Sequence, residues 1–344
     1  MIRLAGWFVV VIVLFGLGTA AWRIIDAVIA SRQPPNYKVA LLLEDFAANG
    51  SAAVKTSYAL LLKTGPNRYI RQDVKGAFEW TTRAANAGDP LAMALLGEMH
   101  LKGEAPDSSL SEALDWFRQS ALKGNSWGIY YMGHVSWFGL GRPSNRPEAI
   151  NYFEKAAALN HPDAARILAA AYNAGDEVPT DPSRAATFLK IAAEHSTNGN
   201  YTLELADWYF SGTNVPKSDL EGVKWLKLAA NSGSPVAARR LGQAMTRGLL
   251  GQPKDLKGAE YWLAKAARYG DGPAQVEMAK IFLARNQPAP AFAWGARAWN
   301  QGQNTEFFRE AAQLAEVAYS QLSPREIAAL IAETHVRAYG EDNH

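Results

Sequence analysis

The chain has 344 residues, of which 48% are apolar and 20% are charged, and this composition is typical of a folded protein with a buried core. Its 35 Lys and Arg residues nearly balance its 33 Asp and Glu residues, so no overall basic field indicates a nucleic-acid partner. Cysteine is absent, which excludes disulfides, thiolate-bound metals, iron–sulfur clusters and a thiol nucleophile.

The N-terminal segment is apolar and carries no charge over residues 4–22. A helix of this length covers roughly 28 Å, close to the ~30 Å hydrocarbon thickness of a bilayer. Trp7 and Trp22 lie near its two ends, where indole rings favour the membrane interface. The sequence therefore predicts an N-terminal transmembrane helix within residues 1–32. The small residues 18–20 leave a cleaved signal peptide as the alternative.

The orientation of this anchor follows from two opposing arguments. The basic residues Arg23, Arg32 and Lys38 after the segment favour a cytoplasmic C-terminal domain. A signal-like segment ahead of a large domain usually directs that domain outward. We therefore expect a single-pass protein of the bacterial inner membrane with its repeat domain in the periplasm, and the cytoplasmic orientation remains the alternative.

The rest of the chain repeats one phrase about every 36 residues: an aromatic residue, two small residues beginning four positions later, and a turn residue. The aromatic positions are Trp80, Trp116, Tyr152, Phe188, Trp225, Trp262 and Trp294. Self-similarity at this period is typical of stacked helical units. We expect these aromatic side chains in the core, so that Trp262→Ala would open a cavity.

Each unit is predicted to contain two helices. The first runs from about Val74 to Ala87, and Gly88 supplies the turn residue that ends it. Asp89 and Pro90 then begin the second helix in the N-cap and N1 order that helices prefer. The two helices are expected to form a hairpin, and loops rich in Gly and Pro separate successive units.

This pattern resembles that of a known repeat family. Ala92, Leu96, Gly97 and Gly103, followed by Ala113, Trp116, Ala121 and Gly124, match the motif of the Sel1-like repeat family, a branch of the tetratricopeptide-type solenoids. The resemblance implies an all-α solenoid of helical hairpins and a scaffold that acts through protein binding. We expect repeats over 66–302, a linker and degenerate capping pair over 33–65, and capping helices over 303–344. These closing helices are expected at about 304–319 and 323–338, and the second begins with Ser323 as N-cap, Pro324 at N1 and Glu326 at N3.

No catalytic or cofactor-binding pattern accompanies the repeats. The six histidines form no HExxH or other metal-binding spacing, no Gly-x-Ser-x-Gly motif is present, and the acids are scattered over the repeats. The sequence therefore predicts no enzyme, no cofactor and no metal.

Some aromatic residues lie outside the repeat positions. They gather in one unit, at Trp127, Tyr130, Tyr131, Trp137 and Phe138, with Trp208 as a second, separate candidate. Because aromatic side chains are enriched at protein interfaces, we predict a partner-binding patch here. Additional core between repeats is the alternative.

Together these features predict a membrane-anchored scaffold or adaptor. We expect an assembly or regulatory subunit of a bacterial cell-envelope complex that binds a protein partner, and the oligomeric state stays open. The alternative is a carbohydrate or cell-wall binding subunit in polysaccharide secretion or envelope remodelling, with the additional aromatic rings as stacking platforms.

Overall fold

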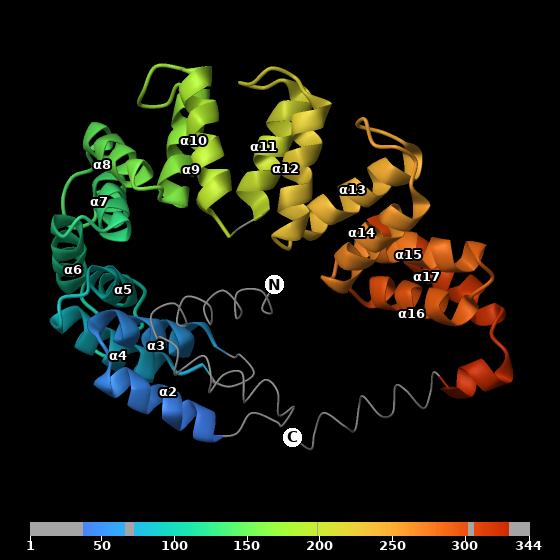
Figure 1. The fold of residues 1–344 in the computed structure, drawn as a ribbon, viewed down its shortest axis with the longest axis horizontal. Helices are drawn as coiled ribbons and strands as arrows, with labels where there is room; N and C mark the ends of the chain where they lie inside the picture. The colour runs from blue at the N-terminus through green and yellow to red at the C-terminus, as the bar shows by residue number, and fades with distance from the viewer. Residues whose placement is uncertain (1–36, 66–71, 198, 302–305, 330–344) are drawn as a thin grey trace. The chain divides into compact units, whose positions relative to one another are not determined.

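The computed structural model describes residues 37–65, 72–197, 199–301 and 306–329, and every regular element among them is an α-helix (Figure 1). The chain divides into two compact units, residues 1–196 and 197–344. Each unit is described by itself.

The first unit contains nine described helices that follow one another in short succession. They are α2 (Tyr37–Asn49), α3 (Ala52–Thr64), α4 (Val74–Asn86), α5 (Pro90–Leu101), α6 (Leu110–Leu122), α7 (Ser126–Phe138), α8 (Arg146–Ala158), α9 (Pro162–Ala174) and α10 (Pro182–His195). The second unit continues the same alternation. Its helices are α11 (Gly199–Ser211), α12 (Asp219–Asn231), α13 (Pro235–Arg247), α14 (Leu256–Arg268), α15 (Gly272–Ala284), α16 (Pro288–Gln301) and α17 (Glu306–Ser320).

The predicted helix boundaries are confirmed at the caps. The Asp89 carboxylate accepts a hydrogen bond from the backbone N–H of Ala92 at 2.9 Å, and Pro90 occupies the first turn of α5. Near the C-terminus, Ser323 and Glu326 form a reciprocal capping box, with the Glu326 N–H donating to Ser323 Oγ and the Ser323 N–H donating to the Glu326 carboxylate. Local capping chemistry therefore sets where these helices begin.

The predicted pair of helices, α4 and α5, is in contact, but the more extensive packing involves the next helix along the chain. In the first unit, α5 packs more extensively on α6 than on α4, and α7 packs more extensively on α8 than on α6. Gly97 of α5 shows why, because a Cβ atom there would lie 2.6 Å from the Phe117 ring and 3.0 Å from the Ala113 carbonyl oxygen of α6. The pairs α5–α6 and α7–α8 are thus joined by the longer Gly- and Pro-containing loops rather than by the short turns.

The repeat aromatic is also less central than predicted. Trp80 and Trp225 are buried, but the five other members of the series are only half-buried. The residue that follows the aromatic is the one at the centre of the core, as at Phe117 and Leu263. One residue corresponds to a rotation of about 100° around a helix, and this places the neighbour on the face that carries the repeat alanines. Trp262→Ala is therefore not the substitution that opens the largest cavity.

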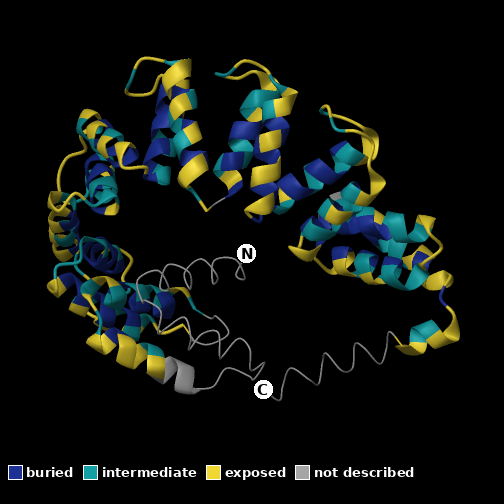
Figure 2. Ribbon diagram, viewed as in Figure 1, coloured by how far each residue is buried: buried dark blue, intermediate teal, exposed yellow. Residues whose placement is uncertain are grey.

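Burial within each unit follows the faces between paired helices, and exposed residues follow the loops and outer faces (Figure 2). In the first unit, α5 contacts α3 on one side and α7 on the other, so these odd-numbered helices form one layer. The even-numbered helices α4, α6 and α8 lie against this layer.

Residues 4–22, where the membrane anchor is predicted, lie outside the described residues. Among the residues that are described, no helix is both long enough and apolar enough to cross a bilayer. Of the closing helices predicted at 304–319 and 323–338, α17 matches the first, and residues 324–329 are the described part of the second.

Candidate functional site

Four aromatic side chains form a continuous row along α7. Trp127, Tyr130, His134 and Phe138 follow one another at the three- and four-residue spacing that places side chains on one side of a helix. Their ring centroids are separated by 6.1 Å, 4.6 Å and 5.5 Å in that order. Trp127 is 38% exposed and Phe138 is 61% exposed, at the two ends of the row. We call this row the α7 aromatic face.

Two of the predicted patch residues serve packing instead. Tyr131 stacks on the buried Phe117 ring with a centroid distance of 4.4 Å. Trp137 is half-buried and lies on another side of α7, with the Arg146 guanidinium 3.8 Å above its ring and Phe153 at 6.0 Å. These contacts are those of the added core, whereas Trp127 and Phe138 are exposed on the same helix.

Trp208, the separate candidate, lies on α11 in the second unit and is half-buried. The α7 aromatic face belongs to the first unit.

His161 packs against two residues of the α7 aromatic face. Its role was not predicted from the sequence. Its ring stacks on Tyr130 with a centroid distance of 4.3 Å and meets Trp127 edge-on at 4.4 Å. It is the N-cap of α9, where its Nδ1 accepts the N–H of Ala164 at 3.3 Å. The signal in the sequence was a histidine at the N-cap position of this helix. The equivalent helices α5, α13 and α15 have Asp or Ser as the N-cap residue.

Burial controls the charge of this region. Desolvation lowers the pKa of His161 to about 4, opposed by the negative charge of Asp163 and reinforced by His134. Desolvation also lowers the pKa of His134, and Asp163 opposes that shift as well. Both imidazoles are therefore neutral at neutral pH, and the α7 aromatic face is uncharged along its row.

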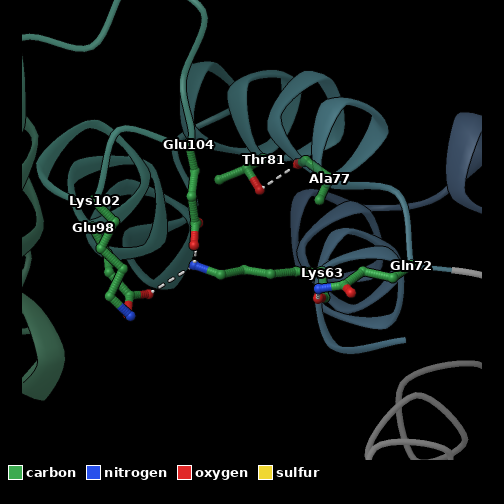
Figure 3. A network of polar contacts seen from close by, with 7 residues as sticks. All are labelled: Lys63, Gln72, Ala77, Thr81, Glu98, Lys102 and Glu104. Carbon is green, nitrogen blue, oxygen red and sulfur yellow. Dashed lines mark hydrogen bonds and ion pairs between the residues drawn. The ribbon is translucent and has the colours of Figure 1, made fainter. Parts of the chain in front are cut away.

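An ion-pair network joins α3 to α5 and to the residues that follow α5 (Figure 3). Lys63 Nζ lies 3.1 Å from Glu98 and 3.0 Å from Glu104, and Lys102 Nζ lies 2.5 Å from the other oxygen of Glu98. Burial would raise the pKa of Glu98, but hydrogen bonds and charge from Lys102 and Lys63 lower it overall. Burial raises the pKa of the Tyr131 hydroxyl on α7, and the negative charge of Glu98 raises it further.

The described residues contain no group of three or more His, Asp and Glu side chains placed to bind a metal ion. The α7 aromatic face is an apolar surface whose inner side chains are held by ring contacts.

Comparison with known proteins places the repeats. A model of the Sel1 repeat matches residues 55–89, 90–125, 128–161, 162–196, 202–234 and 235–271. The first match begins inside α3, in the segment that the sequence analysis assigned to a degenerate cap. No curated protein matches the chain.

Two solved structures are similar over most of their length. A Sel1 repeat protein from Oxalobacter formigenes is 26% identical, with a TM-score of 0.52 over 63% of this chain and 88% of that one. A protective antigen of uropathogenic Escherichia coli with an SLR fold is 22% identical, with a TM-score of 0.57 over 86% of this chain and 67% of that one. The second likeness concerns the fold alone.

Proposed function

Because the chain belongs to the Sel1 repeat family, whose members are generally scaffolds for protein–protein interactions, we propose that it binds a protein partner through the α7 aromatic face. The observation that carries this proposal is the exposure of Trp127 and Phe138 at the ends of a row whose inner members are held in place by ring contacts. Exposed large aromatics that are already ordered lose little side-chain entropy on binding, and this favours them as anchors.

Solenoids of this type are typically non-enzymatic. We extend this to the present chain, whose role would be to hold a partner rather than to transform a substrate. A curved array of helices presents a long surface that can engage a peptide segment or a folded domain through many shallow contacts.

The apolar segment 4–22 adds a location to this role. As a membrane anchor, it would keep the bound partner at a raised effective concentration near the bilayer. We therefore propose an adaptor or regulatory subunit of a bacterial cell-envelope complex, with the repeats on the periplasmic side of the inner membrane. A C-terminal fusion to a reporter enzyme that is active only outside the cytoplasm tests this side directly, and an inactive but stably produced fusion would contradict it.

The binding proposal is tested by crosslinking followed by measured affinity. A photoreactive residue at position 138 of the full-length chain should capture one protein, and the same residue at position 122, which is exposed on the neighbouring helix α6, should not. The captured protein is then purified and titrated against the full-length chain in detergent. The double substitution of Trp127 and Phe138 to Ala should weaken binding by at least tenfold, as expected for anchor residues.

The matched control replaces two exposed leucines outside the face, Leu122 and Leu159, with Ala. Equal binding by the two double variants would contradict the proposal. Saturable binding of a purified polysaccharide, lost on substitution of Trp127 and Phe138 and requiring no protein, would replace the protein partner with the carbohydrate alternative.

A further inference from the structure

A groove opens between α4 and α6 in the first unit, on the side away from the odd-numbered layer. Its volume is about 480 Å³. Leu96 and His100 of α5 line its base, Phe78 belongs to the α4 wall, and Trp116 belongs to the α6 wall. We call it the α4–α6 groove.

The charges that line this groove are all of one sign. Asp107, Glu112 and Asp115 line it, and no Lys or Arg does. Asp115 is paired with Arg118 on its own helix at 2.5 Å. Glu112 lies 3.1 Å from Nδ1 of the buried His100. Negative charge and an aromatic wall therefore meet in one hollow.

The next groove along the first unit contains its own arginine. The α6–α8 groove, with a volume of about 400 Å³, is lined by Arg142 and by Tyr152, which takes the place of Trp116 one repeat later. Arg142 donates to Ser136 and pairs with Glu148 at 2.7 Å. Ser136 and Glu148 lie 36 residues after His100 and Glu112, and Arg142 lies 36 residues after Pro106.

One repeat further, an arginine lies at a different position, because Arg184 is 36 residues after Glu148, where the two earlier repeats have Glu. The Arg184 guanidinium lies 4.1 Å from the Tyr172 ring centroid and 5.7 Å from that of Phe188, and it donates to Glu154 at 2.7 Å. Phe188 is the repeat aromatic that corresponds to Trp116. In both later repeats an arginine of the chain itself thus meets a carboxylate near the repeat aromatic.

We infer that the α4–α6 groove binds an arginine side chain of a protein partner. The carboxylates and the aromatic wall are present, and Pro106 stands where the chain supplies its own arginine in the next repeat. Arginine fits better than lysine because its planar guanidinium can bond to carboxylates and stack on an aromatic ring together. The inference rests on the proposed function in one respect, namely that the ligand is a protein. It does not rest on the α7 aromatic face, because the groove is lined by other residues.

The test uses a defined peptide, acetyl-Leu-Arg-Leu-amide, and the same peptide with neutral citrulline in place of arginine. The full-length chain in detergent is labelled with 5-fluorotryptophan, and its Trp116 resonance is assigned from the Trp116→Phe variant. The arginine peptide should shift this resonance saturably, with a Kd on the order of 1 mM at low salt. The citrulline peptide should bind about tenfold more weakly, and added salt should weaken the arginine peptide.

Two variants examine the cause. Glu112→Gln should weaken binding of the arginine peptide several-fold, because it removes a carboxylate from the groove. Pro106→Arg should abolish the saturable shift, because it supplies from within the chain the guanidinium that Arg142 supplies in the next groove. Leu122→Arg, which adds the same charge at an exposed position outside the groove, should leave binding unchanged. Melting temperature, followed by circular dichroism, checks that all three variants are folded.

Equal binding of the arginine and citrulline peptides, or unchanged binding by both Pro106→Arg and Glu112→Gln, would overturn the inference. The double substitution of Trp127 and Phe138 should not alter the peptide titration. Failure of the α7 aromatic face to bind a partner and failure of this groove to bind arginine are therefore separate outcomes.

Discussion

The α7 aromatic face and the α4–α6 groove are candidate surfaces of the same unit that arise in opposite ways. The face consists of aromatic residues added outside the repeat pattern, and its histidines are held neutral by burial. The groove consists of repeat positions themselves and differs from the α6–α8 groove in having Pro106 where that groove has Arg142. In a repeat protein, a binding site can thus come from an omission as well as from an addition, and the two sites should differ in their response to salt.

The largest effect is expected from a residue that supports both surfaces. Phe117 stacks on Tyr131 beside the face and lies against Gly97 of α5, close to the base of the groove. Phe117→Ala should lower the free energy of unfolding by about 3 to 5 kcal/mol, because it leaves a cavity in a fully buried site. Urea unfolding of the full-length chain, followed by circular dichroism, measures this cost.

The matched control for Phe117 is its neighbour Trp116, which is half-buried and lines the groove. Trp116→Ala should cost clearly less stability and should impair only the binding of the arginine peptide. A greater loss of stability from Trp116→Ala than from Phe117→Ala would reverse our assignment of core and wall.

The second effect concerns pH and applies to the face alone. The pKa of His161 falls from 6.5 to about 4 on folding, so protons bind the unfolded chain more readily between these values. Its contribution to stability is complete above pH 6.5 and is lost as the pH falls to 4, a change of about 3 kcal/mol. His161→Asn keeps a capping oxygen for α9 and should flatten the stability profile in this window.

His195→Asn is the control for this pH dependence, because His195 is exposed. It should leave the profile unchanged, and the dependence that remains in His161→Asn should come from groups such as His134. An identical profile for His161→Asn and the unaltered chain would show that His161 does not control this transition.

The smallest effect on stability is expected from the arginine that fills the second groove. The pair of Arg142 and Glu148 is partly exposed, so Arg142→Ala should change the free energy of unfolding by less than about 1 kcal/mol. The same substitution should allow the α6–α8 groove to bind the arginine peptide, which a 3-fluorotyrosine label at Tyr152 would report. Arg146→Ala, which removes an arginine outside the groove, should create no such binding.

Much of the helix pattern was predictable because its signals are local. Asp89, Pro90 and the residues 323–326 act through neighbours in the chain, and the structure confirms their capping contacts. The predicted resemblance to Sel1 repeats is likewise confirmed. The depth of each aromatic was not predictable, since Trp116 and Phe117 are adjacent and equally apolar, and only packing against Gly97 places Phe117 at the centre.

The candidate site was also predictable only in part. The sequence indicated an excess of aromatics at 127–138 but could not separate Trp137, which packs under Arg146, from Phe138, which is exposed. His161 belongs to the site through its contacts with Tyr130 and Trp127, which lie 31 and 34 positions earlier in the chain. The use of this face for binding remains a prediction.

By itself, the sequence determined the repeat, its period, the caps of its helices and the all-helical fold, because each depends on short-range spacing and composition. Only the tertiary structure decided which helices pair most closely, which member of each aromatic pair is buried, and which grooves contain an arginine of their own. Those outcomes depend on contacts between residues some 20 to 40 positions apart, where side-chain volume and charge are matched in space rather than along the chain.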